Sequence, residues 1–270
     1  MNPLPERRTC YSRHFFAPKP DFRMCTLVLS RRPGHDWPIL IAANRDEMAG
    51  RPWKAPARHW PDRPEVTAGL DELAQGSWLG MNDHGVVAAI LNRVGTLGPA
   101  PGKRSRGELV LDALDHADAD QAAQALADLD GRAWRPFNMI VADNRDAFWA
   151  KSDGTGLVHI NTIPPGLHMI SAMDLDDSAS PRLAAYLPRF QAAPLPDPDH
   201  GDWQAWQALM ADGGGTGSDT EETAAMCFLR PSGFGTVSSS LIALPAMDSE
   251  QKPLWLFAPG PPDKSLYSIT

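Results

Sequence analysis

The chain has 270 residues, of which 43% are hydrophobic, and its formal net charge is −8. This length suits one domain or at most two, with enough apolar side chains for a sizeable core. The negative balance argues against nucleic acid as the main partner, and no apolar run reaches the roughly eighteen residues that stable insertion of a helix into a membrane needs.

The first segment of the chain differs in character from the rest. Residues 1–23 contain four prolines and several basic side chains, and they lack the apolar stretch of a secretory signal. We expect this segment to be a disordered leader or the product of a misassigned start, with a cleaved pro-segment and a genuine tail as alternatives. Residues 24–270 are expected to form a single domain.

Met24 stands directly before Cys25, so a start at Met24 followed by its removal, or cleavage of the leader, would leave Cys25 at the N-terminus. The α-amino group of such a residue has an unperturbed pKa of roughly 7.7–8.0 and can act as a base beside its own thiol. That is the logic of an N-terminal nucleophile. The alternative is a cysteine that packs as a small buried hydrophobe on a strand.

The cysteines and histidines give no sign of a disulfide framework or a metal site. Cys10, Cys25 and Cys227 are too few for disulfide scaffolding, which favours a reducing, cytoplasmic setting. The eight histidines are scattered, with no HExxH or paired CxxC pattern, so no metal ligand is predicted.

The first half of the chain predicts hairpins. Residues 25–30 and 38–43 predict two strands that end at Asn44-Arg45-Asp46-Glu47. Residues 48–65 are rich in Pro, Trp and Arg and predict a long ordered loop. Residues 76–82 and 86–91 predict a second hairpin around the turn at Asp83-His84-Gly85.

The second half mixes helices with further hairpins. The capping-box spacing from Ser105 to Glu108, and a second cap at Asp118, predict two consecutive helices over 106–129. Ser180-Pro181 predicts a capped helix that reaches about residue 190, and 203–210 predicts another, before a flexible loop at 213–217. Further strands are expected at 137–142, 147–152, 157–161, 167–172, 236–244 and 254–258. This pattern indicates an α+β layered domain.

Amide hydrolysis by an N-terminal cysteine needs a thiolate, a base, a group that orients the amine, and an oxyanion hole. Cys25 could supply the thiolate and the base, and Asp46 could accept hydrogen bonds from the α-amino group. Arg45 could lower the pKa of the thiol. The side-chain amide of Asn92, with a backbone N–H, could stabilise the oxyanion.

Ordinary structural roles compete with these assignments. Asn44-Arg45-Asp46-Glu47 also fits a charged turn with local salt bridges, and Asn82 and Asn92 also fit turn-flanking positions.

Six motifs are spaced along the chain: Met24-Cys25-Thr26, Asn44-Arg45-Asp46-Glu47, Gly76-Ser77-Trp78-Leu79-Gly80-Met81-Asn82, Phe137-Asn138, Gly166-Leu167-His168 and Gly235-Thr236 with Ser238-Ser239. Together they resemble the NRDE family, which includes the transport and Golgi organisation protein 2. The resemblance covers roughly residues 24–258 and implies that Met24 is the start. It also implies a four-layer αββα fold of the N-terminal-nucleophile hydrolase type, with two mostly antiparallel sheets flanked by helices.

The choloylglycine hydrolase and penicillin V acylase group is a more distant resemblance, in which Met-Cys-Thr also opens the chain. It implies Cys25 as the nucleophile, Asp46 as the acid that orients the amine, and Asn92 as an oxyanion donor. The residues expected to contact substrate are Asn44, Trp78, Asn82 and Ser171.

Three departures from that group bear on the site. Its Arg-Asn-x-Asp motif is here Ala43-Asn44-Arg45-Asp46, and we expect the displaced arginine to lie on a different face of an extended segment. Ala172 stands where that group has an asparagine, and Val237 where it carries a late arginine. One oxyanion donor and one supporting charge are therefore expected to be missing.

Two functions follow. The first is an amidohydrolase that cleaves a small-molecule C–N amide bond. The second is a non-catalytic protein that binds or traffics haem or an acyl-lipid or acyl-CoA, because relatives in the NRDE family are connected with such ligands. Haem is the one cofactor considered, as a ligand; its aromatic contacts would come from Trp37, Trp53, Trp60 and Trp78, and its axial ligand from His35, His59 or His84. The partner in either case is a small molecule, and the sequence does not predict the oligomeric state.

Overall fold

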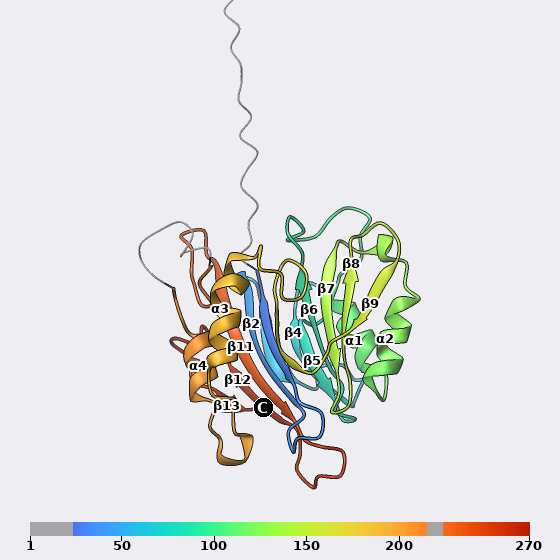
Figure 1. Cartoon of the computed structure of the whole chain (residues 1–270). Helices are drawn as coiled ribbons and strands as arrows, with labels where there is room; N and C mark the ends of the chain where they lie inside the picture. The colour runs from blue at the N-terminus through green and yellow to red at the C-terminus, as the bar shows by residue number, and fades with distance from the viewer. Residues whose placement is uncertain (1–23, 215–223) are drawn as a thin grey trace, which may run out of the picture.

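Two antiparallel sheets lie face to face, with a pair of helices against the outer face of each (Figure 1). The computed structural model describes residues 24–214 and 224–270. The leader 1–23 and most of the loop expected at 213–217 lie outside the described residues. The α+β fold with four αββα layers, as expected, is confirmed.

The first sheet has six strands, and its central members are buried on both faces. Residues 39–42 of the second strand are wholly buried, which explains why that strand reads as a continuous apolar run rather than an alternating one. In spatial order the strands are β10 (Gly166–Ile170), β1 (Thr26–Arg31), β2 (Ile39–Met48), β11 (Phe234–Leu244), β12 (Leu254–Ala258) and β13 (Ser268–Ile269).

The second sheet is a seven-stranded meander in which every strand pairs with its neighbour in sequence. Its strands are β3 (Trp53–Ala57), β4 (Val66–Asp71), β5 (Leu79–Asn82), β6 (Val87–Asn92), β7 (Phe137–Ala142), β8 (Ala147–Ser152) and β9 (Val158–Thr162). The hairpins expected at 76–91 and 137–152 are confirmed.

The prediction of a long loop over residues 48–65 is wrong, because β3 forms there and β4 follows it. Pro56 lies inside β3, and the pairing with β4 is irregular between Lys54 and Ala57. Proline is tolerated on an edge strand, where its missing N–H costs no ladder bond. Pro56, one of the prolines that suggested a loop, instead lies in the edge strand of the second sheet.

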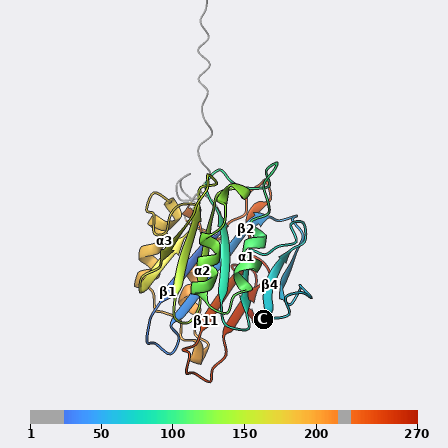
Figure 2. The same cartoon turned by 90° about the vertical axis from the view of Figure 1, so that its right-hand side faces the viewer.

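The helices are α1 (Gly107–Leu114), α2 (Ala119–Ala127), α3 (Pro181–Ala192) and α4 (Gln204–Met210). Helices α1 and α2 cover the second sheet, as Figure 2 shows, and α3 and α4 cover the first. Three apolar clusters result: one under α1 and α2, one between the sheets, and one under α3 and α4. None of the helices that the structure describes is long and apolar enough to cross a bilayer.

Two of the three expected helix caps form. Asp118 accepts from the backbone N–H of Gln121, and Ser180 from that of Leu183. The capping box at Ser105 is wrong, because Arg106 occupies the N-cap position of α1 without a side-chain cap. The carboxylate of Glu108 is taken by the indole N–H of Trp134, at 2.6 Å, so it does not reach back to the cap.

The Asn44-Arg45-Asp46-Glu47 motif lies inside β2 and not in a turn, which corrects the expected end of that strand. Residues Asn44 to Met48 pair with β11, whose first residues extend the sheet beyond the β1–β2 hairpin. The strand pairing supplies the backbone partners that a turn would otherwise need. Consecutive motif residues therefore point to opposite faces of the first sheet.

Candidate active site

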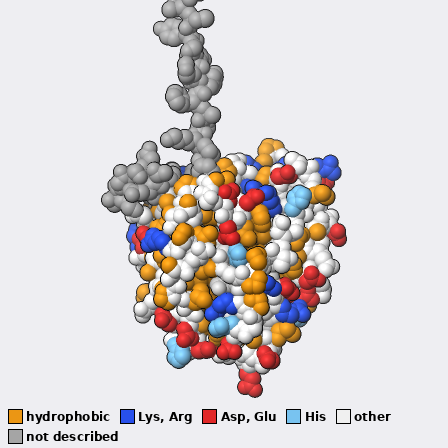
Figure 3. All heavy atoms as spheres, in the orientation of Figure 1, with side chains coloured by type: hydrophobic (Ala, Val, Ile, Leu, Met, Phe, Trp, Pro, Cys, Tyr) orange, Lys and Arg blue, Asp and Glu red, His pale blue; other side chains and the backbone are white. Residues whose placement is uncertain are grey.

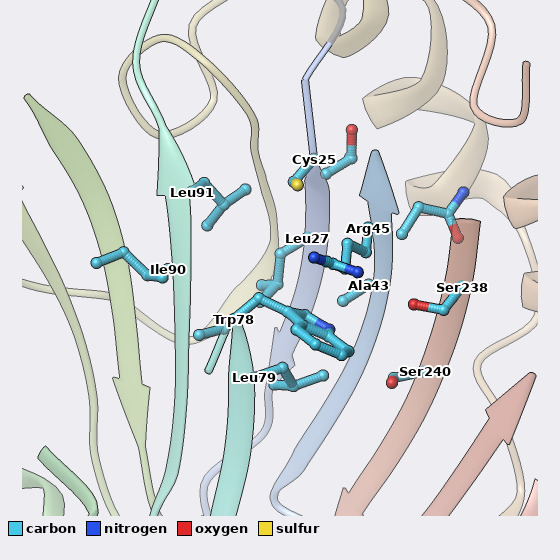
Figure 4. A pocket seen from close by; sticks show the side chains of 13 residues that line it. Cys25, Leu27, Ala43, Arg45, Trp78, Leu79, Ile90, Leu91, Ser238 and Ser240 are labelled. Atoms are coloured by element: carbon cyan, nitrogen blue, oxygen red, sulfur yellow. The ribbon is translucent and has the colours of Figure 1, made fainter. Parts of the chain in front are cut away.

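A pocket opens between the two sheets at Cys25 (Figure 4). It encloses about 330 Å³ of empty space, part of it continuous with solvent. Aliphatic side chains line one part, and polar groups of β2 and β11 line another. The lining residues are Cys25, Thr26, Leu27, Ala43, Asn44, Arg45, Trp78, Leu79, Ala89, Ile90, Leu91, Ser238 and Ser240.

Cys25 directly precedes β1, and its thiol lies against β2. The backbone N–H of Asp46 donates to its Sγ at 3.3 Å, and the Ser171 hydroxyl donates to its carbonyl oxygen at 3.0 Å. Burial raises the pKa of the Cys25 thiol to about 12, and the nearby Asp46 carboxylate adds to that rise while Arg45 opposes it. In this state the thiol is protonated at neutral pH.

Asp46 lies on the face of β2 that is covered by α3. Arg182 Nη1 donates to its Oδ2 at 3.0 Å, and Thr236 Oγ1 donates to its Oδ1 at 2.8 Å. Burial raises the pKa of Asp46, while Arg182 and Thr236 act in the opposite direction. Both carboxylate oxygens thus have fixed partners, and the side chain is held in one orientation.

A β-bulge in β11 makes these contacts compatible with the pocket. Thr236 pairs with Asp46 and Ser238 with Arg45, so Val237 is an extra residue opposite β2. Without the bulge, Thr236 and Ser238 would share a face. With it, Thr236 reaches the Asp46 carboxylate, while Ser238 lines the pocket.

Arg45 points from β2 into the space between the sheets. Its guanidinium stacks on Trp78, 4.0 Å from the ring centroid, and lies 5.9 Å from that of Trp53. Its Nη2 lies 3.5 Å from Asp71, but the buried Nη1 has no hydrogen-bond partner among the described residues. Burial lowers the pKa of Arg45.

The expectation that the displaced arginine changes face is wrong. Ala43 and Arg45 both line the pocket, since residues two apart share a face of a strand. A shift by two positions moves the guanidinium along the pocket but leaves it on the same side of the sheet.

Sequence reasoning missed Arg182, and it named Thr236 only within a motif, so neither was expected as a partner of Asp46. Arg182 supplies a guanidinium there from the first turn of α3. A cation at that end of a helix is unfavourable to the helix dipole. That position was the one signal that Arg182 serves something other than its helix.

The other predicted residues divide into two groups. Asn44 lines the pocket, and its amide nitrogen donates to the carbonyls of Met210 and Met226 while its buried Oδ1 has no partner among the described residues. Ser171 holds the backbone at Cys25, and Trp78 lines the pocket beside Arg45.

Asn82 and Asn92 do not line the pocket. Both amide donor contacts of Asn82 go to carbonyls at the end of α1, at 2.9 and 2.7 Å. Asn92 follows Leu91, which does line the pocket, and alternation along β6 turns the next side chain to the opposite face.

The bond between Met24 and Cys25 lies inside the same network. The Met24 carbonyl accepts from Arg182 Nη1, Thr26 Oγ1 and the Ser171 hydroxyl, and Met24 itself is buried. While Met24 is attached, the α-nitrogen of Cys25 is an amide and not a base.

The histidines considered as haem ligands lie elsewhere. None of them lines the pocket. His35 accepts from the backbone N–H of Trp37 in its own loop, His59 lies by the carbonyl of Ala55 in β3, and His84 lies by Glu65. Within residues 24–214 and 224–270, no group of three His, Cys, Asp or Glu side chains could hold a metal ion. Acidic and basic side chains are intermixed over the face shown in Figure 3.

Comparison with known proteins places this chain in a family. The family model described as Transport and Golgi organisation 2 matches residues 24–245. No curated protein matches the chain.

Solved structures with a similar fold are N-terminal-nucleophile hydrolases. The N-acylethanolamine-hydrolyzing acid amidase ortholog of Caenorhabditis elegans has a TM-score of 0.55 at 12% identity, covering 91% of this chain and 100% of that one. Penicillin V acylase of Agrobacterium tumefaciens has a TM-score of 0.47 at 13% identity, covering 87% and 83%. A conjugated bile acid hydrolase variant of Clostridium perfringens has a TM-score of 0.47 at 11% identity, covering 91% and 96%. At 12% identity the likeness to the Caenorhabditis elegans protein shows the fold alone, and that fold agrees with the one expected from the motifs.

Proposed function

The chain belongs to the Transport and Golgi organisation 2 family and has the fold of N-terminal-nucleophile hydrolases, and from these premises we propose that it is an N-terminal-cysteine amidohydrolase. Its substrate is a small molecule with an amide bond. The observation that carries the proposal is the contact between the Cys25 thiol and β2 at Asp46, at the edge of a pocket.

The proposed reaction begins once residues 1–24 are absent. The free α-amino group of Cys25 takes the thiol proton, and the thiolate attacks the amide carbon of the substrate. The tetrahedral intermediate collapses as the C–N bond breaks, and the leaving amine takes the proton. Water then hydrolyses the thioester, which releases the acid and restores the thiol.

Arg182 and Asp46 set the state of that amine. The Cys25 α-nitrogen is bonded to the carbonyl carbon of Met24, whose oxygen accepts from Arg182 Nη1. The guanidinium beside the amine favours its neutral form, and the Asp46 carboxylate accepts a hydrogen bond that orients it.

Asn92 stays the predicted oxyanion donor from the motif resemblance, although its side chain leaves β6 on the other face. Removing one oxyanion donor typically lowers kcat about 10²–10³-fold. A substantially smaller loss in Asn92→Ala would assign the oxyanion to other donors.

Ligand binding without turnover is the second candidate, and one observation favours it. With Met24 attached, the thiol is protonated and the α-nitrogen is blocked, so the pocket can bind but cannot start the reaction. Its aliphatic lining suits an acyl chain. Haem is less well supported, because no histidine lines the pocket.

The test compares two forms of the protein. One is released from a cleavable fusion so that it starts at Cys25, and the other retains Met24. Amine release from a panel of acyl amides is measured for both, with Cys25→Ala as the control. We expect turnover only in the form that starts at Cys25. Equal inactivity of that form and Cys25→Ala, with retained acyl-ligand binding, would replace the amidase by a ligand-binding protein. A cytoplasmic setting, which we also propose, would keep the thiol reduced.

A further inference from the structure

The buried guanidinium of Arg45 has a donor with nothing to donate to. The side chain is only 5% exposed, and Nη1 has no partner among the described residues. The nearby Asp71 carboxylate is not an acceptor for Nη1. It lies 2.7 Å from Arg51 Nε, and its contact with Arg45, at 3.5 Å, is with Nη2.

Burying an unpaired charged donor costs free energy, and two tryptophan rings hold the Arg45 guanidinium in position. Trp78 covers one face of the guanidinium at 4.0 Å, and Trp53 approaches at 5.9 Å. Ring faces attract a cation but do not replace a hydrogen-bond acceptor. Buried polar groups are nearly always hydrogen-bonded, so an unpaired one in a pocket calls for a ligand.

The position of Arg45 fixes where an anionic ligand group would lie. Thr26 pairs with Asn44, so Cys25 is opposite Arg45 in the β1–β2 register. Figure 4 shows the guanidinium between the Cys25 sulfur and the Trp78 ring. An anion on Nη1 is therefore close to the bond that the thiol attacks.

Part of the remaining lining is aliphatic. Leu27, Leu79 and Leu91 would contact an acyl chain there. A carboxylate at the far end of an acyl chain would be many bonds from the thiol. A carboxylate on the amine side, two bonds from the amide nitrogen, would reach Arg45.

We propose that Arg45 determines specificity by binding the carboxylate of an N-acyl amino acid, whose acyl chain occupies the aliphatic part of the pocket. This inference rests on the proposed amidase function for its chemistry. The binding it describes does not require turnover, so the two can be tested apart. A carboxylate accepts a charge-assisted hydrogen bond from a guanidinium, which is stronger than the bond that a neutral hydroxyl can form.

The experiment uses N-octanoylglycine and N-octanoylethanolamine, which share the amide and the chain and differ in carboxylate against hydroxymethyl. With protein that starts at Cys25, we expect kcat/KM to favour the glycine conjugate by about 10- to 100-fold, the range for a lost hydrogen bond to a charged group. Arg45→Met should bring the ratio close to one, and Arg45→Lys should keep part of it. Arg31→Met is the matched control, because it removes a positive charge from the same sheet without lining the pocket.

The ratio of the two kcat/KM values distinguishes binding of the substrate carboxylate from a general effect of Arg45 on catalysis. Arg45 also opposes the rise in the pKa of the thiol, so Arg45→Met can slow both substrates. An equal loss for both would make Arg45 an activator of the thiol or an oxyanion donor, and would overturn the inference while leaving the amidase intact.

A binding measurement in the Cys25→Ala background tests the carboxylate site separately, in case the amidase proposal fails. If no substrate is hydrolysed, but calorimetry shows a preference for octanoylglycine that Arg45→Met removes, the inference stands and the amidase fails. Equal affinity for the two ligands in that background would overturn the inference.

Discussion

Arg182 donates from Nη1 to the Asp46 carboxylate at 3.0 Å, in a pair whose side chains are 1% and 0% exposed. The two residues are 136 positions apart in sequence, on α3 and β2. Their pairing joins the helix layer to the first sheet close to Cys25, the residue before β1. It also means that the stability of the fold and the orientation of the proposed amine depend on the same contact.

Breaking that pair from one side should destabilise the protein strongly. Arg182→Met leaves the Asp46 carboxylate buried without its cation, and we expect a loss of about 3–5 kcal/mol in the free energy of unfolding, measured by urea denaturation. The double variant Arg182→Met/Asp46→Asn removes both charges and should recover part of that loss. A double variant no more stable than Arg182→Met would show that the unpaired charge is not the source.

The thiol of Cys25 should be unreactive while Met24 is attached. A pKa of about 12, against roughly 8.5 for a free cysteine, leaves on the order of 10³-fold less thiolate at pH 7. We expect alkylation by iodoacetamide to be slower by about that factor than in urea, and to speed up about tenfold for each pH unit up to pH 11. In protein that starts at Met24 and so lacks Cys10, Cys227→Ala isolates the signal from Cys25. A rate that levels off near pH 8 would contradict the prediction.

Gly69 leaves room for the Trp78 ring, which supports Arg45. A Cβ at this position would overlap the ring atoms of Trp78. Gly69→Ala should therefore displace the ring, shift the tryptophan emission and destabilise the chain by about 1–3 kcal/mol, as overpacking does. Gly50→Ala is the control, because a Cβ there meets nothing within 4 Å. Equal stability of the two variants would show that Trp78 can relax without loss.

His168 should make the stability depend on pH. Its Nδ1 lies 2.6 Å from Asp176, and this hydrogen bond raises the pKa of His168. Because the folded-state pKa is raised, the contribution is fully present below the unfolded value of about 6.5 and is lost as the pH rises through the folded value. The stability difference between wild type and His168→Gln should thus be larger at about pH 5.5 than at about pH 9, in urea titrations. A difference that grows with pH would reverse the assignment.

Local patterns in the sequence were enough for most of the fold. The hairpins follow from alternation and turn residues, and the caps at Asp118 and Ser180 place two helix starts. The contact between Cys25 and Asp46 could also be foreseen, because a hairpin brings the two strands together. The edge strand with Pro56 could not, since edge position is a property of the finished sheet.

The site was less predictable, because its partners come from distant segments. Nothing local to Arg182 or Thr236 says that both reach Asp46. The face that a side chain takes is decided by single residues of register, which is why Leu91 lines the pocket and Asn92 does not. Spacing arguments from one sequence do not fix that register.

The extra residue at Val237 has a consequence for how this strand can vary. Before Val237, the side chain of Thr236 points with that of Asp46 toward the helix layer. After Val237, the side chains of Ser238 and Ser240 point into the space between the sheets. If Val237 were deleted, the side chain of Thr236 would turn from the helix layer toward the space between the sheets. The Asp46 carboxylate would then lose its hydrogen bond from Thr236, and the threonine side chain would line the pocket instead. The two faces that β11 presents on either side of Val237 therefore depend on that one extra residue.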